Sequence, residues 1–164
     1  MKTGILCDLD GTVIDSRPEQ QQLMCGTLTP AELRARTANH PAPVPQVLRW
    51  LHSMHAQGVP ITYVTGRPPD PANRRMLARI DAPPGTLVTT PPGDVPHRTK
   101  RDLAVSLTDR GFRLYALDDD PVMHWLYSEM PGVTPVLIPG WRVEDYGTPI
   151  NPTLPDPHLK DVTR

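Results

Sequence analysis

The sequence of 164 residues lacks the features that mark several broad classes of protein. Its two cysteines, Cys7 and Cys25, stand in no C-x-x-C pair, which argues against a disulfide framework and against a zinc site. A net charge of −1 provides no overall attraction to nucleic acids or anionic membranes, so any such contact must come from a local patch. No apolar run approaches the roughly 18 residues that a membrane span requires.

Lysine is scarce as well, because three lysines accompany 14 arginines. A lysine in the middle of the chain, Lys100, therefore stands out as a functional candidate. We expect no signal peptide, because Met1 leads almost directly into residues 4–7, which are apolar and typical of a core strand. The expected location is therefore the cytoplasm.

What the sequence does contain is an alternation of short apolar runs with helical patterns, which is typical of βαβ units and a parallel sheet. Strands are expected at 4–8, 60–65, 86–89, 113–118 and 134–138, and helices at about 44–54, 71–81, from about 99, and at 121–130. Thr99 to Asp102 resembles a capping box, and Asp120 is suited to be the N-cap of the last helix. We predict one α/β domain at residues 1–140, with a central parallel five-stranded sheet, and a Pro-rich irregular tail at 141–164.

Reactive side chains follow three of the expected strands. The segments are Asp8-Leu9-Asp10-Gly11-Thr12, Thr65-Gly66-Arg67 and Asp118-Asp119-Asp120. Open α/β sheets place their active sites at the carboxyl ends of the strands. Side chains two residues apart on extended backbone point the same way, so we expect Asp8 and Asp10 to converge on one substrate. Gly11 then allows the chain to turn away.

Two neighbouring carboxylates suggest a division of labour in phosphoryl chemistry. One attacks phosphorus and forms a mixed anhydride, and the other protonates the leaving oxygen and then activates water. A hard divalent cation supplies the missing positive charge, and magnesium suits a site made of oxygen ligands. Asp118 and Asp119 are the expected anchor for the cation, whereas Lys100 and Thr65 are candidates to contact the phosphoryl oxygens.

The order of these motifs resembles that of the haloacid dehalogenase superfamily: D-x-D-G-T, a strand ending in Thr-Gly-Arg, a lysine, and then Asp-Asp. The resemblance covers about residues 4–120 and implies a three-layer Rossmann-like fold and a magnesium-dependent phosphatase. It also implies that Asp8 is the nucleophile and Asp10 the general acid and base. Magnesium would then be held by Asp8, the backbone carbonyl of Asp10, and Asp118 or Asp119.

Three segments resemble, more closely, the 3′-phosphatase domain of polynucleotide kinase-phosphatases. They are Thr65-Gly66-Arg67, Pro92-Gly93-Asp94, and Asp118-Asp119 before a helix with Trp125. This likeness implies that Arg67 and Asp94 serve the site. The predicted catalytic residues are Asp8, Asp10, Thr65, Arg67 and Lys100, the substrate-binding residues are Gly11, Thr12, Gly66 and Asp94, and the metal ligands are Asp8, Asp10, Asp118 and Asp119.

Many members of this superfamily carry a cap domain, and the sequence leaves no space for one. Residues 16–59 hold a Pro-rich stretch and one amphipathic helix. We therefore expect an open site, suited to macromolecular ends or completed by a neighbour in an oligomer such as a homodimer. A group of basic residues after the second strand either forms a basic rim for phosphates or belongs to a solvated helix face. Its members are Arg67, Arg74, Arg75, Arg79, His97, Arg98 and Arg101.

The leading hypothesis is a phosphomonoesterase that removes 3′-phosphates from nucleic-acid ends. The first alternative is a phosphatase of the same superfamily for a small metabolite or nucleotide. The second is a non-catalytic binding module with the same fold. The intact set of Asp8, Asp10, Lys100 and Asp118 argues against the second alternative.

Overall fold

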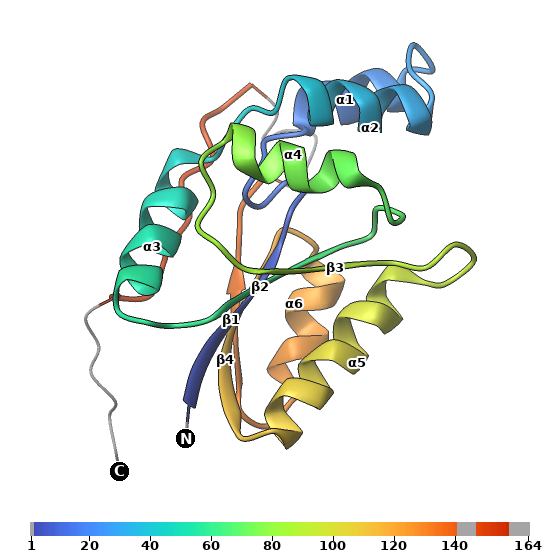
Figure 1. The fold of residues 1–164 in the computed structure, drawn as a ribbon. Helices are drawn as coiled ribbons and strands as arrows, with labels where there is room; N and C mark the ends of the chain where they lie inside the picture. Colours follow the sequence, from blue (N-terminus) through green and yellow to red (C-terminus); the bar gives the residue numbers. More distant parts are fainter. Residues whose placement is uncertain (1, 141–146, 158–164) are drawn as a thin grey trace.

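Five parallel strands form the centre of the computed structural model, which describes residues 2–140 and 147–157 (Figure 1). They are β1 (Lys2–Asp8), β2 (Ile61–Thr65), β3 (Thr86–Thr89), β4 (Phe112–Asp118) and β5 (Val133–Leu137). The order across the sheet is β3-β2-β1-β4-β5, and every neighbouring pair is parallel. The predicted five-stranded parallel sheet is therefore confirmed, and β1 lies in its middle.

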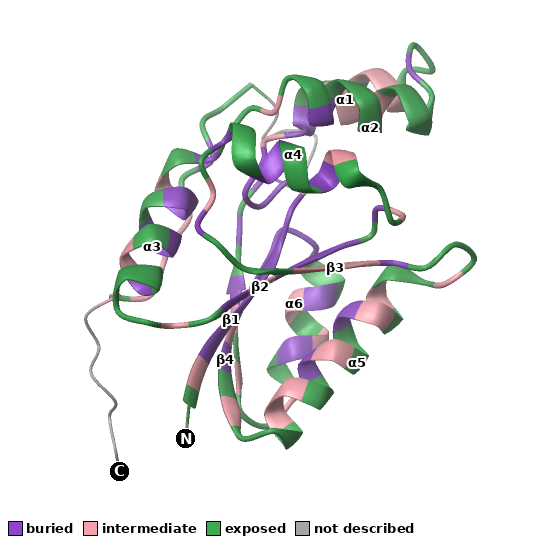
Figure 2. Ribbon diagram, viewed as in Figure 1, coloured by how far each residue is buried: buried purple, intermediate pink, exposed green. Residues whose placement is uncertain are grey.

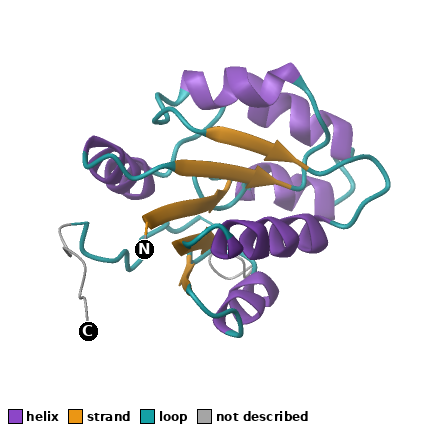
Figure 3. Cartoon of the chain, turned by 60° about the horizontal axis from the view of Figure 1, so that its bottom comes forward, coloured by secondary structure: helices purple, strands orange, loops and turns teal. Residues whose placement is uncertain are grey.

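Helices cover both faces of this sheet, which gives three layers (Figure 3). On one face, α3 (Pro45–Ala56) and α4 (Pro71–Arg79) pack with alternate residues of β1, including Ile5 and Cys7. On the other face, α5 (Pro96–Asp109) and α6 (Pro121–Ser128) pack with Leu6 of the same strand. Because side chains alternate along a strand, β1 is buried on both sides, as expected for a parallel sheet (Figure 2).

Proline stands in the first turn of each of these helices, which explains part of the high proline content. Its fixed φ suits the start of a helix, and its missing N–H has no partner to lose there. Asp120 caps α6 as predicted, because its carboxylate accepts from the N–H of Val122 at 2.8 Å. The expected start of a helix near Thr99 is wrong, since α5 begins at Pro96 and Lys100 lies within its second turn.

The segment before α3 folds into two further helices that the sequence analysis did not anticipate. They are α1 (Arg17–Met24) and α2 (Pro30–Asn39), called here the α1–α2 pair. Thr29 and Glu32 form a reciprocal capping box at the start of α2, with a 2.8 Å bond from the Thr29 N–H to the Glu32 carboxylate. The described residues contain no separate cap domain, as predicted. The α1–α2 pair lies instead beyond the carboxyl end of β1 (Figure 1).

Residues 147–157 of the predicted tail follow the last strand without forming a helix or strand. Ile150 nevertheless belongs to the core beside α3, and the indole N–H of Trp50 donates to the carbonyl of Pro155 at 2.7 Å. The other parts of the predicted tail, 141–146 and 158–164, lie outside the described residues. Of the helices that the structure describes, none combines the length and the apolar character needed to cross a membrane.

Candidate active site

The carboxyl ends of β1, β2 and β4 meet at one edge of the sheet and open into a cavity of about 250 Å³. Because β1 lies between the other two strands, Asp8 is flanked by Thr65 on one side and Asp118 on the other. The residues lining the cavity are Asp8, Asp10, Gln20, Arg34, Thr65, Gly66, Arg67, Pro96, His97, Lys100, Asp119 and Asp120. Most of the residues predicted for the site are therefore brought together.

A buried carboxylate cluster, made of Asp8, Asp118 and Asp119, forms the floor of this site. One carboxylate oxygen of each residue lies within 4.8 Å of the others. The ammonium of Lys100 reaches into the cluster from α5, 2.9 Å from Asp8 Oδ1 and 2.8 Å from Asp118 Oδ2. All four side chains are buried, so these charges interact through a medium that screens them far less than water does.

The electrostatics of the cluster disfavour ionisation of all three carboxyl groups beside a single ammonium. Burial raises the pKa of Asp8 to about 7, against the opposing effect of Lys100. Burial also raises the pKa of Asp119 to about 9, and the charges of Asp8 and Asp118 add to this shift. Burial alone would lower the pKa of Lys100, but the adjacent carboxylates of Asp8 and Asp118 raise it above its ordinary value. One ammonium thus faces three carboxylates, an arrangement that favours binding of a cation.

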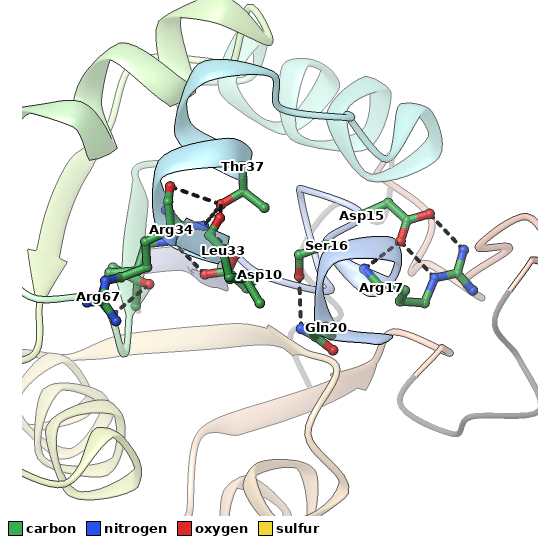
Figure 4. Close-up of polar contacts among 10 residues, drawn as sticks. Asp10, Asp15, Ser16, Arg17, Gln20, Leu33, Arg34, Thr37 and Arg67 are labelled. Carbon is green, nitrogen blue, oxygen red and sulfur yellow. Dashed lines mark hydrogen bonds and ion pairs between the residues drawn. The ribbon is translucent and has the colours of Figure 1, made fainter. Parts of the chain in front are cut away.

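Asp10 lies two residues from Asp8 but has different surroundings. Its two carboxylate oxygens accept from Nε and Nη2 of Arg67 at 2.7 and 2.6 Å, a bidentate ion pair. Nη2 of Arg67 also donates to the hydroxyl of Thr37, and Nη1 donates to the carbonyl of Arg34 at 3.3 Å (Figure 4). Arg67 therefore ties Asp10 to α2.

Gly11 lets the chain turn closely past the carboxylate cluster. It adopts a φ of +79°, which residues with a Cβ rarely adopt, and a Cβ there would lie 1.9 Å from Oδ2 of Asp119. Gly66 plays a related part after β2, because a Cβ at this position would lie 3.1 Å from Pro96 at the start of α5. Both glycines thus allow close packing around the cavity.

Three further predicted residues occupy different positions. Thr65 lines the cavity, and its hydroxyl accepts from the backbone N–H of Arg67 at 3.2 Å. The hydroxyl of Thr12 is buried and has no hydrogen-bond partner within the described part of the chain. Asp94 does not line the cavity. Its carboxylate accepts from the N–H of Val95 at 2.8 Å and lies 3.8 Å from the guanidinium of Arg98. A role of Asp94 in binding substrate stays a prediction without a supporting contact.

Sequence reasoning missed two residues that the α1–α2 pair contributes to the cavity, Gln20 and Arg34. His97, which was expected in the candidate basic rim, comes from α5 and lines the cavity, with its Nε2 2.7 Å from Oδ2 of Asp120. A signal for α2 was present in the sequence, since Thr29 and Glu32 have capping-box spacing just before a helical stretch.

Comparison with solved structures identifies the fold, whereas no family model and no curated protein sequence match the chain. A chain from the Pnkp1/Rnl/Hen1 RNA repair complex matches with a TM-score of 0.68 at 18% identity, over 85% of this chain and 43% of that chain. The class C acid phosphatase from Bacillus anthracis with tungstate bound matches with a TM-score of 0.53 at 25% identity, over 64% of this chain and 47% of that chain. The chain has the haloacid dehalogenase fold.

The order of the motifs predicted a haloacid dehalogenase fold, and the sheet and the matched structures confirm this prediction. Its middle strand, β1, ends in the D-x-D-G-T segment, so Asp8 and Asp10 lie at the centre of the cavity wall. The chain spans less than half of the length of both matched chains, 43% and 47%. The activities of those whole proteins therefore enter only as support for a proposal.

Proposed function

We propose that this chain is a magnesium-dependent phosphomonoesterase that works through an aspartyl-phosphate and removes 3′-phosphates from nucleic-acid ends. The observation that carries the proposal is the contrast between two carboxylates two residues apart. Asp8 faces Lys100 and two further carboxylates, whereas Asp10 is clamped by Arg67. Carboxyl groups in such different environments are suited to different roles, one as nucleophile and one in proton transfer.

The carboxylate cluster fits a magnesium ion. Its three carboxylates offer closely spaced oxygen atoms, and within the described part of the chain Lys100 is the one cation paired with them. Magnesium prefers such hard oxygen ligands. We propose Asp8, Asp118, Asp119 and the backbone carbonyl of Asp10 as the ligands. The bound ion would supply positive charge to offset the negative charge of the cluster and of a phosphoryl group.

Asp8 has the position of a nucleophile. In the first step its carboxylate oxygen bonds to phosphorus while the bond from phosphorus to the leaving oxygen breaks. Lys100 favours the ionised form of Asp8, opposing the burial that raises the pKa of this carboxyl to about 7. The same ammonium and the Thr65 hydroxyl line the cavity with Asp8, where they would contact the phosphoryl oxygens that gain negative charge in the transition state.

Asp10 has the position of the proton-transfer group. Its side chain is 25% exposed, compared with 6% for Asp8, so Asp10 is in better contact with solvent and with a leaving group. It donates a proton to the leaving oxygen in the first step and takes one from the attacking water in the second. That water cleaves the aspartyl-phosphate, which releases phosphate and regenerates the Asp8 carboxylate. Contact with Arg67 orients Asp10 in both steps, through two carboxylate oxygens when Asp10 is ionised and through one when it carries the proton.

The substrate assignment is supported by the nature of the matched structures and by Arg34. A chain of an RNA repair complex shares the fold over most of this chain. The acid phosphatase of the same fold binds tungstate, which is a tetrahedral oxyanion like phosphate. On the cavity wall, Arg34 adds positive charge suited to a further phosphate of the substrate. These observations favour a substrate that carries more than one phosphate.

A phosphatase for a small metabolite or nucleotide is the second candidate. The α1–α2 pair contributes Gln20 and Arg34 to the cavity wall, so part of the opening is covered. A small substrate benefits most from such a cover, because shielding from water strengthens its polar contacts.

A substrate panel separates the two candidates. The full chain is assayed for phosphate release with and without magnesium on a 3′-phosphorylated oligonucleotide, a 5′-phosphorylated oligonucleotide, nucleoside monophosphates and p-nitrophenyl phosphate. We expect magnesium-dependent release with the highest kcat/KM for the 3′-phosphorylated oligonucleotide. A preference for the monophosphates would overturn the nucleic-acid assignment and favour the second candidate. Absence of hydrolysis of all substrates, p-nitrophenyl phosphate included, would overturn the phosphatase proposal itself.

A further inference from the structure

A second hollow adjoins the catalytic cavity and belongs to no part of the mechanism described above. It lies between α2 and the start of α4, has a volume of about 360 Å³, and is called here the α2–α4 groove. Arg34 and Arg67 line both the groove and the catalytic cavity, so the two spaces share a wall. Small side chains on both helices, Ala35 and Ala38 on α2 and Ala72 on α4, leave the space open.

The groove carries positive charge that is available to a ligand. Arg67 is already committed to Asp10 and Thr37. The guanidinium groups of Arg34 and Arg75, by contrast, make no hydrogen bond or ion pair within the described part of the chain, and both line the groove. The one carboxylate of its lining, Asp70, caps α4 by accepting from the N–H of Ala72 at 2.7 Å. Two unpaired guanidinium groups in a groove that adjoins the catalytic cavity suit phosphate groups.

We propose that the α2–α4 groove binds the sugar–phosphate backbone of the strand whose terminal phosphate is removed. Arg34, at the junction of the two spaces, contacts the phosphodiester next to the scissile phosphate, and Arg75 contacts the following one. The inference rests on the proposed phosphatase activity and makes it specific, because it assigns the enzyme to polynucleotide strands and gives the strand a path across the protein. Contacts to the backbone carry no base information, so the groove accepts any sequence.

The experiment compares substrates that differ in the number of phosphates beyond the scissile one. The full chain with magnesium is assayed on a nucleoside 3′-monophosphate, a nucleoside 3′,5′-bisphosphate and a 3′-phosphorylated tetranucleotide. We expect kcat/KM to rise about tenfold for the bisphosphate and by about as much again for the tetranucleotide. Equal values for the monophosphate and the tetranucleotide would overturn the groove. A rise for the bisphosphate without a further rise for the tetranucleotide would restrict the site to nucleotides and also overturn the strand path.

Arg75→Ala tests the groove away from the catalytic residues. We expect it to lower the ratio of kcat/KM for the tetranucleotide to that for the monophosphate about tenfold, and Arg75→Lys to restore most of the ratio. The slope of log kcat/KM against log salt concentration for the tetranucleotide should fall in magnitude by about one in Arg75→Ala. A structural defect would not produce this change in slope. Unchanged ratio and slope would contradict the proposal.

The matched control is Arg74→Ala, because Arg74 is an exposed neighbour on α4 that does not line the groove. It should leave the substrate ratio and the salt slope unchanged. Hydrolysis of p-nitrophenyl phosphate distinguishes a failure of the phosphatase proposal from a failure of the groove proposal. If the wild-type chain does not hydrolyse it, the phosphatase proposal fails, whereas hydrolysis without any dependence on substrate length means that the groove alone is wrong.

Discussion

The two halves of the site differ in charge balance. Around Asp8, three buried carboxyl groups share one ammonium, so ionisation of all three is disfavoured without a further cation. Around Asp10, one carboxylate faces one guanidinium in a bidentate pair. The first half therefore suits a divalent cation, whereas the charge of the Asp10 side chain is already balanced by Arg67. This difference in surroundings supports the different roles proposed for the two aspartates.

Removing the ammonium from the unbalanced half should have the largest effect. Lys100→Met leaves three buried carboxylates without their cation, so we expect the free energy of unfolding to fall by about 3–5 kcal/mol in a urea titration without magnesium. Hydrolysis of p-nitrophenyl phosphate should fall about 1,000-fold. Arg98→Met on the same helix is the control, because its side chain is 64% exposed, and it should change neither quantity. Activity of Lys100→Met within tenfold of wild type would contradict the role of this cation.

Displacing one carboxylate from the cluster should have the next largest effect. Gly11→Ala places a Cβ against Asp119 and also imposes a strained φ, so we expect kcat to fall about 100-fold. Gly93→Ala is the matched control, because Gly93 has a φ of +85° but open space around a Cβ. It should cost about 1–2 kcal/mol of stability without a comparable loss of kcat. Equal kinetic losses in the two variants would mean that backbone strain, and not displacement of Asp119, causes the defect.

In the balanced half, Thr37 is a positioning residue that acts on Asp10 through Arg67. Thr37→Val removes a buried hydroxyl that accepts from Arg67, so the clamp on Asp10 should loosen. We expect kcat to fall about tenfold with little change in KM, because Thr37 does not line the catalytic cavity. Thr37→Ser keeps the hydroxyl and should restore most of kcat. Similar losses in both variants would show that packing of the Thr37 methyl, and not its hydrogen bond, matters.

The imbalance between three buried carboxyl groups and one ammonium also predicts how stability depends on pH in the absence of metal. Burial raises the pKa of Asp119 in the folded protein to about 9, so folding binds a proton that the unfolded chain releases near pH 4. The stability that this bound proton contributes to the folded state is present at low pH and is lost as the pH rises toward 9. Asp119→Asn should therefore raise the stability of the metal-free protein by about 1 kcal/mol at pH 8 and reduce the thermal stabilisation by magnesium. Unchanged stabilisation by magnesium in Asp119→Asn would remove this residue from the metal site.

The buried half of the site could be predicted from sequence because it depends on the sheet. Asp8, Thr65 and Asp118 are the last residues of their strands, and parallel neighbouring strands place their carboxyl ends at one edge. The order of the motifs then suggested the haloacid dehalogenase fold, which the solved structures confirm. Lys100 was recognised although the start of its helix was predicted three residues late, because Pro96 and not Thr99 begins α5.

The balanced half depends on tertiary contacts that no local pattern specifies. The pairing of Arg67 with Asp10 joins residues 57 positions apart, and its contact with Thr37 joins residues 30 positions apart. The capping box of Thr29 and Glu32 marks where α2 begins, but not that its buried face meets Arg67. The α2–α4 groove was likewise not predictable, because Arg75 was one of several arginines that fitted a solvated helix face equally well.

The central claim, that Asp8 is the nucleophile and Asp10 the proton-transfer group, is tested most directly in the Asp10→Asn variant. The nitrophenolate group leaves without help from an acid, so this variant should still form the aspartyl-phosphate but hydrolyse it slowly. Acid quenching after mixing with p-nitrophenyl phosphate and magnesium, followed by intact-protein mass spectrometry, should reveal one added phosphoryl group. Peptide mapping should place it on Asp8, and Asp8→Asn/Asp10→Asn should show none. A phosphoryl group on another residue, or release of nitrophenol by Asp10→Asn at the wild-type rate without any adduct, would contradict the account.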